Sequence, residues 1–464
     1  MAEKIHVCAR KPTSSIDNFV NWILKAHYSQ RRPSSVTSKT KKKGGPPKFC
    51  HAASFEKEDQ KEDLVSSILR EGEMQLALLL LLLPLVLGSE PFYGHRSLLR
   101  HVVVILRHTD RAPLVTFPGD PNKSHRWPLG FGRLTSRGRA NASALGRWLR
   151  SRYAEFLSDD PREVYARSSP VPRCYETAAL VLYGLYPANR EQKEWQPDQP
   201  WQPVPITRVP HGADKYSTVC MPRVRAALRS VVALPEPAYL VDNATSSKPL
   251  FGTLGAVEGF VARMTNLSHK ESSSRRVITV NKIVDSMSVA KEYGLPVPTW
   301  ASRYWRHLQW TAETSLEALS RSQMDHMGGA LLRDSLAKVA ATGETPSSTS
   351  LLRCDPDACD EPKMTLAAYH DVNVAGILLG LNGTLGNRPP YGATILVEVF
   401  TLTSTVMPDL YVQVLYKAGH TVSTLALQGC DEPCSLQSFR ELLERKFKPV
   451  SRTECGWSDH QPLL

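Results

Sequence analysis

The sequence predicts an α/β protein whose sandwich core is built on a mostly parallel sheet and carries an inserted, mainly helical cap domain. Near the start, short apolar β-branched runs alternate with amphipathic helical patterns, which is the order of βαβ units. From about residue 222 to residue 342 the pattern is mostly helical, without a clear strand. Strand patterns then return between residues 364 and 416. A helical insertion within a sheet-based core accounts for this order.

The elements of the first half follow one another in a βαβ pattern. Val102–Leu106 is a continuous apolar run, as expected for a strand buried on both faces of a parallel sheet. Thr135 is a candidate N-cap for the helix that follows. Apolar residues of that helix recur three or four positions apart and share one face: Ala142, Leu145, Leu149, Tyr153 and Phe156. A short strand at 164–166 and a helix around 178–185 come next.

The second half begins with less regular segments. Residues 187–210 are rich in Pro, Trp and Gln, which is typical of a surface loop or a domain boundary. Leu331–Val339 continues a helix that begins near Gly328 and Gly329, and a polar loop follows at 343–362. The remaining apolar runs predict a strand, a helix and a closing hairpin, in this order: 364–369, 376–381, 394–400 and 410–416.

The composition excludes several classes of protein. Of 464 residues, 42% are hydrophobic and 22% are charged, which is ordinary for globular proteins. A collagen, a coiled coil, a polytopic membrane protein and a fully disordered chain are therefore excluded. The formal net charge of +12 favours anionic partners. Charge alone does not separate a nucleic-acid binder from an enzyme that acts on phosphorylated substrates.

An apolar run near the N-terminus predicts export. Leu76–Leu87 is 12 residues long, which is too short to span a bilayer as a helix but suits the core of a signal peptide. We therefore expect a signal peptide over residues 74–89, with Met74 as the initiator. Residues 1–73 are then a non-native or disordered extension. The alternatives are a nuclear signal at Lys41–Lys43 and a signal anchor that keeps the extension in the cytosol.

The cysteines and glycosylation sequons favour an oxidising compartment. Seven cysteines follow Met74, so one is left over if the others pair. Cys354/Cys359 and Cys430/Cys434 are spaced to close small loops, and no neighbouring His or Cys completes a zinc site. Five Asn-x-Ser/Thr sequons begin at Asn122, Asn141, Asn243, Asn266 and Asn382. Together they predict a glycoprotein with disulfide bonds. Without a second long apolar run we expect no stable membrane anchor.

The motif RHTDRAP, at residues 107–113, directly follows the first predicted strand. Loops at the carboxyl ends of parallel strands are where α/β proteins bind ligands. Arg107 and Arg111 flank His108, and guanidinium groups match the oxygens of a phosphate. Their charge disfavours a protonated imidazole, which leaves His108 neutral and able to attack phosphorus. A basic surface loop is the alternative interpretation.

A second pair of polar residues, His370 and Asp371, follows the strand predicted at 364–369. An acid beside a histidine can protonate a leaving oxygen. A His-Asp dipeptide alone is most often structural. Its position at the end of a strand matches that of the first motif and favours a shared site.

These residues resemble the histidine acid phosphatases, in the prostatic and lysosomal branch of the phosphoglycerate-mutase-like superfamily. The family pattern is R-H-G-x-R-x-P near the start and H-D far downstream, and here the two are RHTDRAP and HD. The resemblance extends to FPGDP at 117–121, WPLGFGRLT at 127–135 and PPY at 389–391. It covers about residues 100–456.

The resemblance implies an acid phosphatase that hydrolyses phosphate monoesters without a metal or other cofactor. His108 would be the nucleophile that becomes a phosphohistidine, and Asp371 would donate the proton to the leaving group. Arg107, Arg111 and His370 would bind the phosphate. Arg173 would be a third phosphate-binding arginine, because it matches the last position of the family segment Y-x-R-S-x-x-x-x-R, which leaves a structural role for Arg167.

The resemblance implies two of the family's disulfides in this chain, the local pair Cys430–Cys434 and the long-range pair Cys220–Cys455. Cys174 then remains as a buried free thiol. The departures are Thr109 in place of the motif glycine and Tyr369 where a small residue usually stands. A β-branched Thr109 would crowd the loop if its backbone needed a positive φ. Pro170 and Pro172 also replace the Asp that relatives often carry. Each departure can alter the rate or the choice of substrate.

The expected substrate is a small phosphomonoester or a phosphoprotein in the secretory pathway, extracellular or in the lysosomal lumen, with no nucleic-acid partner. A homodimer is common in the resembling branch. Tyr216 is a candidate for lining the leaving-group side of the site, and the alternative is that it is an ordinary tyrosine on the surface.

The alternative functions are an inactive secreted phospholigand-binding homologue and an intracellular phosphomutase. The expected domains are a core over 98–210 and 360–456, a helical cap over 211–359 and a tail over 457–464.

Overall fold

The structure is a computed structural model that describes residues 97–188, 201–210, 213–240, 249–267, 273–337, 339, 362–402 and 409–457. The predicted extension, signal peptide and Cys354/Cys359 loop lie outside the described residues, as does Asn243. Of the described helices, none is both long and apolar enough to cross a membrane.

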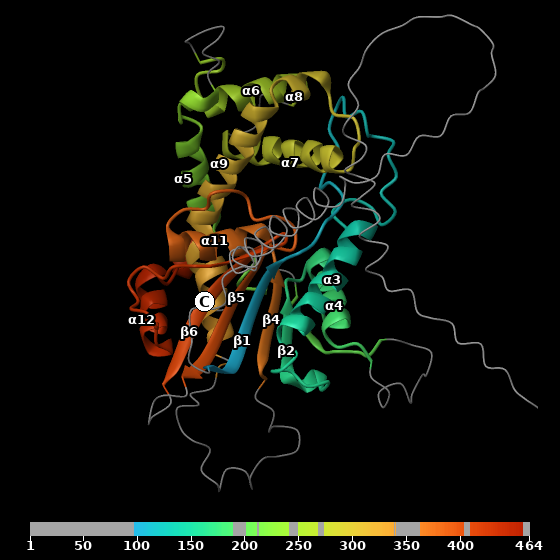
Figure 1. Cartoon of the computed structure of the whole chain (residues 1–464). Helices are drawn as coiled ribbons and strands as arrows, with labels where there is room; N and C mark the ends of the chain where they lie inside the picture. Colours follow the sequence, from blue (N-terminus) through green and yellow to red (C-terminus); the bar gives the residue numbers. More distant parts are fainter. Residues whose placement is uncertain are drawn as a thin grey trace, which may run out of the picture. The chain divides into compact units, whose positions relative to one another are not determined.

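A seven-stranded mixed sheet forms the core, in the order β3-β2-β4-β1-β5-β6-β7 (Figure 1). The strands are β1 Ser97–Arg107, β2 Val164–Ser168, β3 Ile206–Arg208, β4 Met364–Tyr369, β5 Thr394–Leu402, β6 Leu410–Ala418 and β7 Thr421–Thr424. Strands β1 to β4 are mutually parallel, whereas β5, β6 and β7 join antiparallel. The parallel half and the closing hairpin β5–β6 are as predicted. Strand β3, three residues long, lies where the sequence predicted a loop.

Helices cover both faces of the sheet. One face of β1 packs against α3 and α4, and the other packs against α10, α11 and α12. The helices of these layers are α3 Ser136–Arg152, α4 Pro172–Leu185, α10 Ala330–Leu336, α11 Asp371–Asn382 and α12 Leu436–Lys446. The residues of β1 alternate between the two clusters, with Val102 and Val104 on one side and Val103 and Ile105 on the other. This alternation explains the continuous apolar run, because both faces of the strand are buried.

In the predicted cap segment, helices joined by turns and loops are the regular elements of the described residues. Its elements are α5 Met221–Val231, α6 Leu254–Met264, α7 Ser273–Glu292, α8 Thr299–Arg303, α9 Trp305–Gln323 and the π-helical turn η3 Met324–Gly329. Helices α6, α7 and α9 share an apolar core of their own. The helix predicted to begin near Gly328 instead continues from α9 through η3 into α10. Short helices η1 Pro161–Glu163, η2 Ala238–Leu240 and α13 Arg452–Cys455 complete the described elements.

The cysteines pair as the resemblance implied. Cys220 is bonded to Cys455, and Cys430 is bonded to Cys434. Cys174 is free and fully buried, and burial raises the pKa of its thiol to about 12. A buried thiol with such a pKa stays protonated, so Cys174 is a packing residue rather than a second nucleophile.

Helices α3 and α4 approach so closely that glycine is required at their contact. A Cβ on Gly146 would collide with the carbonyl oxygen of Val181. We expect Gly146→Ala to lower the free energy of unfolding by about 1–3 kcal/mol or more, because neither backbone can retreat within a packed core. Urea denaturation measures this change. Gly259→Ala in α6 is the matched control, since only the end of a flexible Arg263 side chain lies near. It should stabilise by up to about 1 kcal/mol. Equal effects from both substitutions would contradict the close helix contact.

Candidate active site

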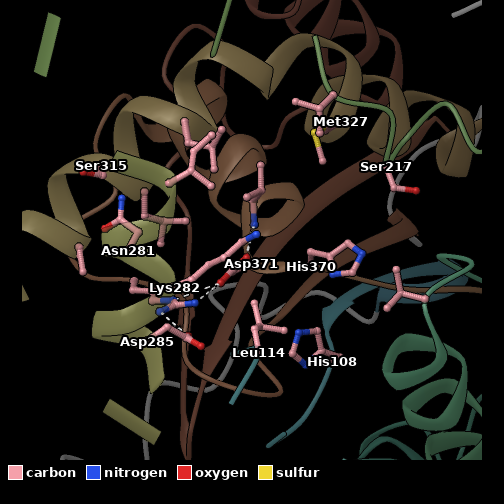
Figure 2. A pocket seen from close by; sticks show the side chains of 18 of the residues that line it. His108, Leu114, Ser217, Asn281, Lys282, Asp285, Ser315, Met327, His370 and Asp371 are labelled. Carbon is pink, nitrogen blue, oxygen red and sulfur yellow. Dashed lines mark hydrogen bonds and ion pairs between the residues drawn. The ribbon is translucent and has the colours of Figure 1, made fainter. Parts of the chain in front are cut away.

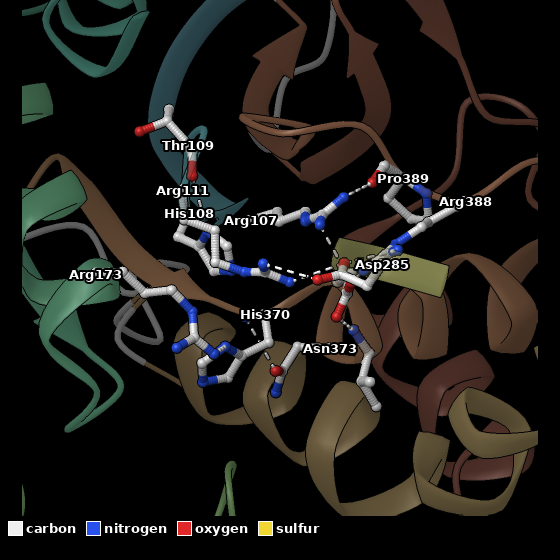
Figure 3. Close-up of polar contacts among 12 residues, drawn as sticks. Arg107, His108, Thr109, Arg111, Arg173, Asp285, His370, Asn373, Arg388 and Pro389 are labelled. Carbon is white, nitrogen blue, oxygen red and sulfur yellow. Dashed lines mark hydrogen bonds and ion pairs between the residues drawn. The ribbon is translucent and has the colours of Figure 1, made fainter. Parts of the chain in front are cut away.

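The sheet brings the predicted site residues together at one edge. The last residue of β1, Arg107, pairs with the last residue of β4, Tyr369, and β2 ends beside them. Because these three strands are parallel neighbours, the residues that follow them emerge side by side. The ring centroids of His108 and His370 are 5.9 Å apart, and Arg173 lies in the first turn of α4 next to His370 (Figure 3).

Five of the six predicted site residues line one cavity of about 470 Å³ (Figure 2). They are His108, Arg111, Arg173, His370 and Asp371. Arg107 differs, since it lines a neighbouring cavity of about 430 Å³ and lies against Asp371. The structure therefore gathers all six side chains in one region, where Arg107 contacts the others through its ion pair with Asp371.

The hydrogen bonds of His108 define its tautomer. Its Nδ1 lies 2.9 Å from the carbonyl oxygen of Thr109. A carbonyl can only accept, so Nδ1 carries the hydrogen and Nε2 keeps its lone pair. Burial lowers the pKa of His108 well below its ordinary value, and the charges of Arg173, Arg107 and Arg111 lower it further. The imidazole is therefore neutral even in acid, with one nitrogen free to act as a nucleophile.

His370 is held in the opposite tautomer. Arg173 Nη2 lies 3.4 Å from its Nδ1, and a guanidinium only donates, so Nδ1 accepts. The other nitrogen, Nε2, then donates to Ser169 Oγ at 2.9 Å. Burial, followed by the charge of Arg173, lowers the pKa of His370 to about 3. His370 is thus a neutral hydrogen-bonding group whose orientation is set from both sides.

Asp371 begins α11 and is ion-paired with two arginines. Its Oδ2 lies 3.3 Å from Arg107 Nη2 and 2.7 Å from Arg388 Nη2. Burial raises the pKa of this carboxyl, but the charges of Arg107 and Arg388 outweigh burial and hold the pKa well below its usual range. Asp371 is therefore ionised in the site as the structure presents it.

Arg388 and Asp285 are parts of the site that the sequence did not reveal. Asp285, on α7, accepts two hydrogen bonds from Arg111, at 2.9 and 3.0 Å. Arg388 lies 3.3 Å from the same carboxylate (Figure 3). Because Arg388 is also ion-paired with Asp371, it joins the two carboxylates. Arg388 directly precedes the PPY segment of the family resemblance, but its charge belongs to no motif. Asp285 belongs to no sequence motif either, because it is a single acidic residue within a helix.

Two of the departures from the family pattern, Thr109 and Tyr369, are accommodated locally. Among the described residues only Asn266 has a positive φ without being glycine, so the backbone of Thr109 is unstrained. The Thr109 N–H donates to Thr177 Oγ1 at 3.2 Å. Tyr369 is fully buried, and its hydroxyl donates to Asp214 at 3.1 Å. Neither residue displaces a charged group from the cavity.

Tyr216 and Arg167 lie outside the cavity lining. Tyr216 is buried, and its hydroxyl donates to Asp334 at 2.5 Å. It neither lines the cavity nor lies on the surface, so both expectations for it were wrong. Arg167 donates to the hydroxyl of Tyr369 at 3.2 Å and stacks on the ring of Tyr216. These contacts agree with a structural role for Arg167.

No group of three or more His, Cys, Asp or Glu side chains is arranged to hold a metal ion within the described residues. The charged groups of the cavity lining are instead the guanidinium groups of Arg111, Arg173 and Arg388, the ammonium group of Lys282, and the carboxylates of Asp285 and Asp371.

Comparison with known proteins agrees with this geometry. The profile of the histidine phosphatase superfamily (branch 2) matches residues 98–417. Human testicular acid phosphatase is 30% identical over 406 residues, covering 83% of this chain and 86% of the relative. Human lysosomal acid phosphatase is 29% identical over 397 residues, covering 83% and 86%. Rat prostatic acid phosphatase is 27% identical over 401 residues, covering 85% and 98%.

Among solved structures, the apo form of Hafnia alvei phytase has the same fold, with a TM-score of 0.52 and 18% identity, over 79% of this chain and 99% of that one. The profile match spans more than half of the sequence and contains both motifs. The chain therefore belongs to the histidine phosphatase superfamily, branch 2, as a phosphoric monoester hydrolase of the histidine acid phosphatase type.

Proposed function

We propose that the protein hydrolyses phosphate monoesters through a phosphohistidine on His108. Nε2 attacks phosphorus as the ester P–O bond breaks, and Asp371 gives its proton to the departing oxygen. Water then attacks the phosphohistidine and returns a proton to Asp371, which releases inorganic phosphate and regenerates the imidazole. The observation that carries the proposal is the free lone pair on a neutral, buried His108 beside three arginines.

The arginines supply the positive charge that the reaction needs. Arg107, Arg111, Arg173 and His370 are proposed to bind the phosphate oxygens and to stabilise charge that develops during transfer. A bound phosphate also acts on Asp371. Its negative charge offsets Arg107 and Arg388 and so raises the pKa of the carboxyl, which favours uptake of the proton to be donated.

We also propose that the protein works in the secretory pathway, outside the cell or in the lysosome, on a small phosphomonoester or a phosphoprotein. The two disulfides support an oxidising compartment. The low pKa of His108 supports an acidic compartment. An ordinary imidazole is about 97% protonated at pH 5 and is then unable to attack phosphorus. His108 stays neutral in acid because its pKa is lowered well below the ordinary value.

Phosphate release from p-nitrophenyl phosphate at pH 5 tests the proposal. We expect turnover by the glycosylated protein, undiminished by EDTA, together with an acid-quenched phosphopeptide that carries phosphate on His108. Tight binding of inorganic phosphate without release would instead support the inactive phospholigand-binding alternative. Loss of activity with EDTA, restored by a divalent cation, would overturn the arginine-only mechanism.

The pH profile tests the influence of Arg388 on Asp371. The charge of Arg388 stabilises the carboxylate, so Arg388→Met should raise the pKa of Asp371. A proton donor with a higher pKa stays protonated to a higher pH, so the basic limb of kcat should move upward. Steady-state rates on an alkyl phosphate measure this shift. Arg388→Lys keeps the charge and should move the limb less. An unmoved limb in Arg388→Met would show that Asp371 does not limit the reaction at high pH.

A further inference from the structure

The cavity that holds His108 extends well beyond the room that a phosphate needs. Apart from the predicted catalytic and phosphate-binding residues, and apart from Arg388 and Asp285, the one charged residue in its described lining is Lys282. The rest of the wall is mostly apolar and comes largely from α5, α7 and α9. Its larger members are Leu114, Leu228, Ile278, Leu316, Leu319 and Met327.

Two hydrogen-bonding atoms in this apolar wall have no partner. Ser315 and Asn281 line the cavity, and their side-chain oxygens, Oγ and Oδ1, are buried and make no hydrogen bond within the described part of the chain. Figure 2 shows both side chains on the side formed by α7 and α9, away from His108. A buried polar atom without a partner is costly, and such atoms at a cavity wall are commonly satisfied by what the cavity binds.

We infer, on the basis of the proposed function, that the preferred substrates are phosphate monoesters of amphiphilic alcohols. An alkyl group would cover the apolar wall, and one hydroxyl or ester group would meet Ser315 and Asn281. The volume of about 470 Å³ lies within the range of small-molecule sites, about 300–1,000 Å³. A substrate with several phosphates would need several further cations, whereas this wall offers Lys282 alone.

A series of n-alkyl phosphates, used below their critical micelle concentrations, tests the apolar part. From ethyl to decyl phosphate, kcat/KM should rise with each methylene until the wall is covered, by up to about fourfold per methylene. A flat series, or faster hydrolysis of inositol hexakisphosphate than of decyl phosphate, would overturn the inference. Turnover of p-nitrophenyl phosphate in the same preparation separates this failure from a failure of the proposed function, which would abolish both activities.

Matched variants on α9 test whether the alkyl chain of the substrate contacts the apolar wall. Leu316→Lys places a charge in the cavity and should lower kcat/KM for decyl phosphate at least about tenfold, with ethyl phosphate little changed. Thr314→Lys adds the same charge to the same helix at a residue outside the cavity lining, and it should leave the chain-length dependence intact. Equal losses on both substrates in Leu316→Lys, in a protein that melts normally, would place the alkyl chain elsewhere.

The polar part is tested with a hydroxyl on the leaving group. A 1-alkylglycerol 3-phosphate should be preferred over the n-alkyl phosphate of equal chain length. Ser315→Ala should reduce this preference about tenfold. Ser320→Ala is the control, because its hydroxyl is equally buried and unpartnered on the same helix but does not line the cavity. A preference that survives Ser315→Ala and Asn281→Ala would show that neither residue meets the substrate.

Discussion

His108→Ala should reduce the rate of phosphate release by roughly 10⁴-fold or more, because it removes the atom that we propose receives the phosphoryl group. The fold should remain. The imidazole is neutral and buried among arginines, so within the described part of the chain its loss breaks no ion pair and, of side-chain hydrogen bonds, only the one to the adjacent backbone. Stopped assays with p-nitrophenyl phosphate, together with a thermal melt, separate the loss of chemistry from a loss of folding.

Two controls make the result specific. His101→Gln replaces a different buried histidine, one within β1, and should keep most of the activity. Its Nε2 lies 3.1 Å from Thr365 Oγ1 on the neighbouring strand. Added imidazole should partly restore turnover to His108→Ala and should itself become phosphorylated. A variant at position 108 that keeps a tenth of its activity without imidazole would show that phosphate passes directly to water.

The parts of this site that could be predicted share one property: their signal is local. His108 and His370 each follow an apolar strand directly, and strand order then brings the two together. The arginines proposed to bind phosphate are likewise recognisable within short motifs. The fold could be predicted for the same reason, since alternation, capping and apolar runs are read over a few residues. Strand β3 was not predicted, because three residues are too few to show an alternating pattern.

The parts that could not be predicted are made by tertiary contact. Asp285 meets Arg111 across 174 residues of sequence, and a lone acid among apolar helix positions has no spacing that marks it. The apolar wall was missed for a related reason. The periodicity of α9 shows which face is apolar, but Leu316 could equally pack against a neighbouring helix or face a hollow. Only the arrangement of α5, α7 and α9 distinguishes the two.

Asp371→Asn should lower kcat by about 10²–10⁴-fold on alkyl phosphates, because an amide has no acidic proton to give to a strongly basic leaving oxygen. On p-nitrophenyl phosphate the loss should be much smaller, since nitrophenolate leaves without help. The shape of the side chain is preserved, but Arg107 and Arg388 lose their carboxylate. Inorganic phosphate should therefore inhibit the variant at least as strongly as it inhibits the wild type.

The same substitution also distinguishes the two steps of the reaction. If Asp371 takes the proton from water in the second step, Asp371→Asn should form the phosphohistidine from p-nitrophenyl phosphate faster than it hydrolyses it. A burst of nitrophenolate, about one equivalent per site, would then precede slow turnover. Asp334→Asn is the control, because that carboxylate pairs with Lys215 outside the cavity, and it should show neither effect. Equal losses on alkyl and nitrophenyl esters, without a burst, would mean that Asp371 only positions Arg107 and Arg388, and that the proton reaches the leaving group by another route.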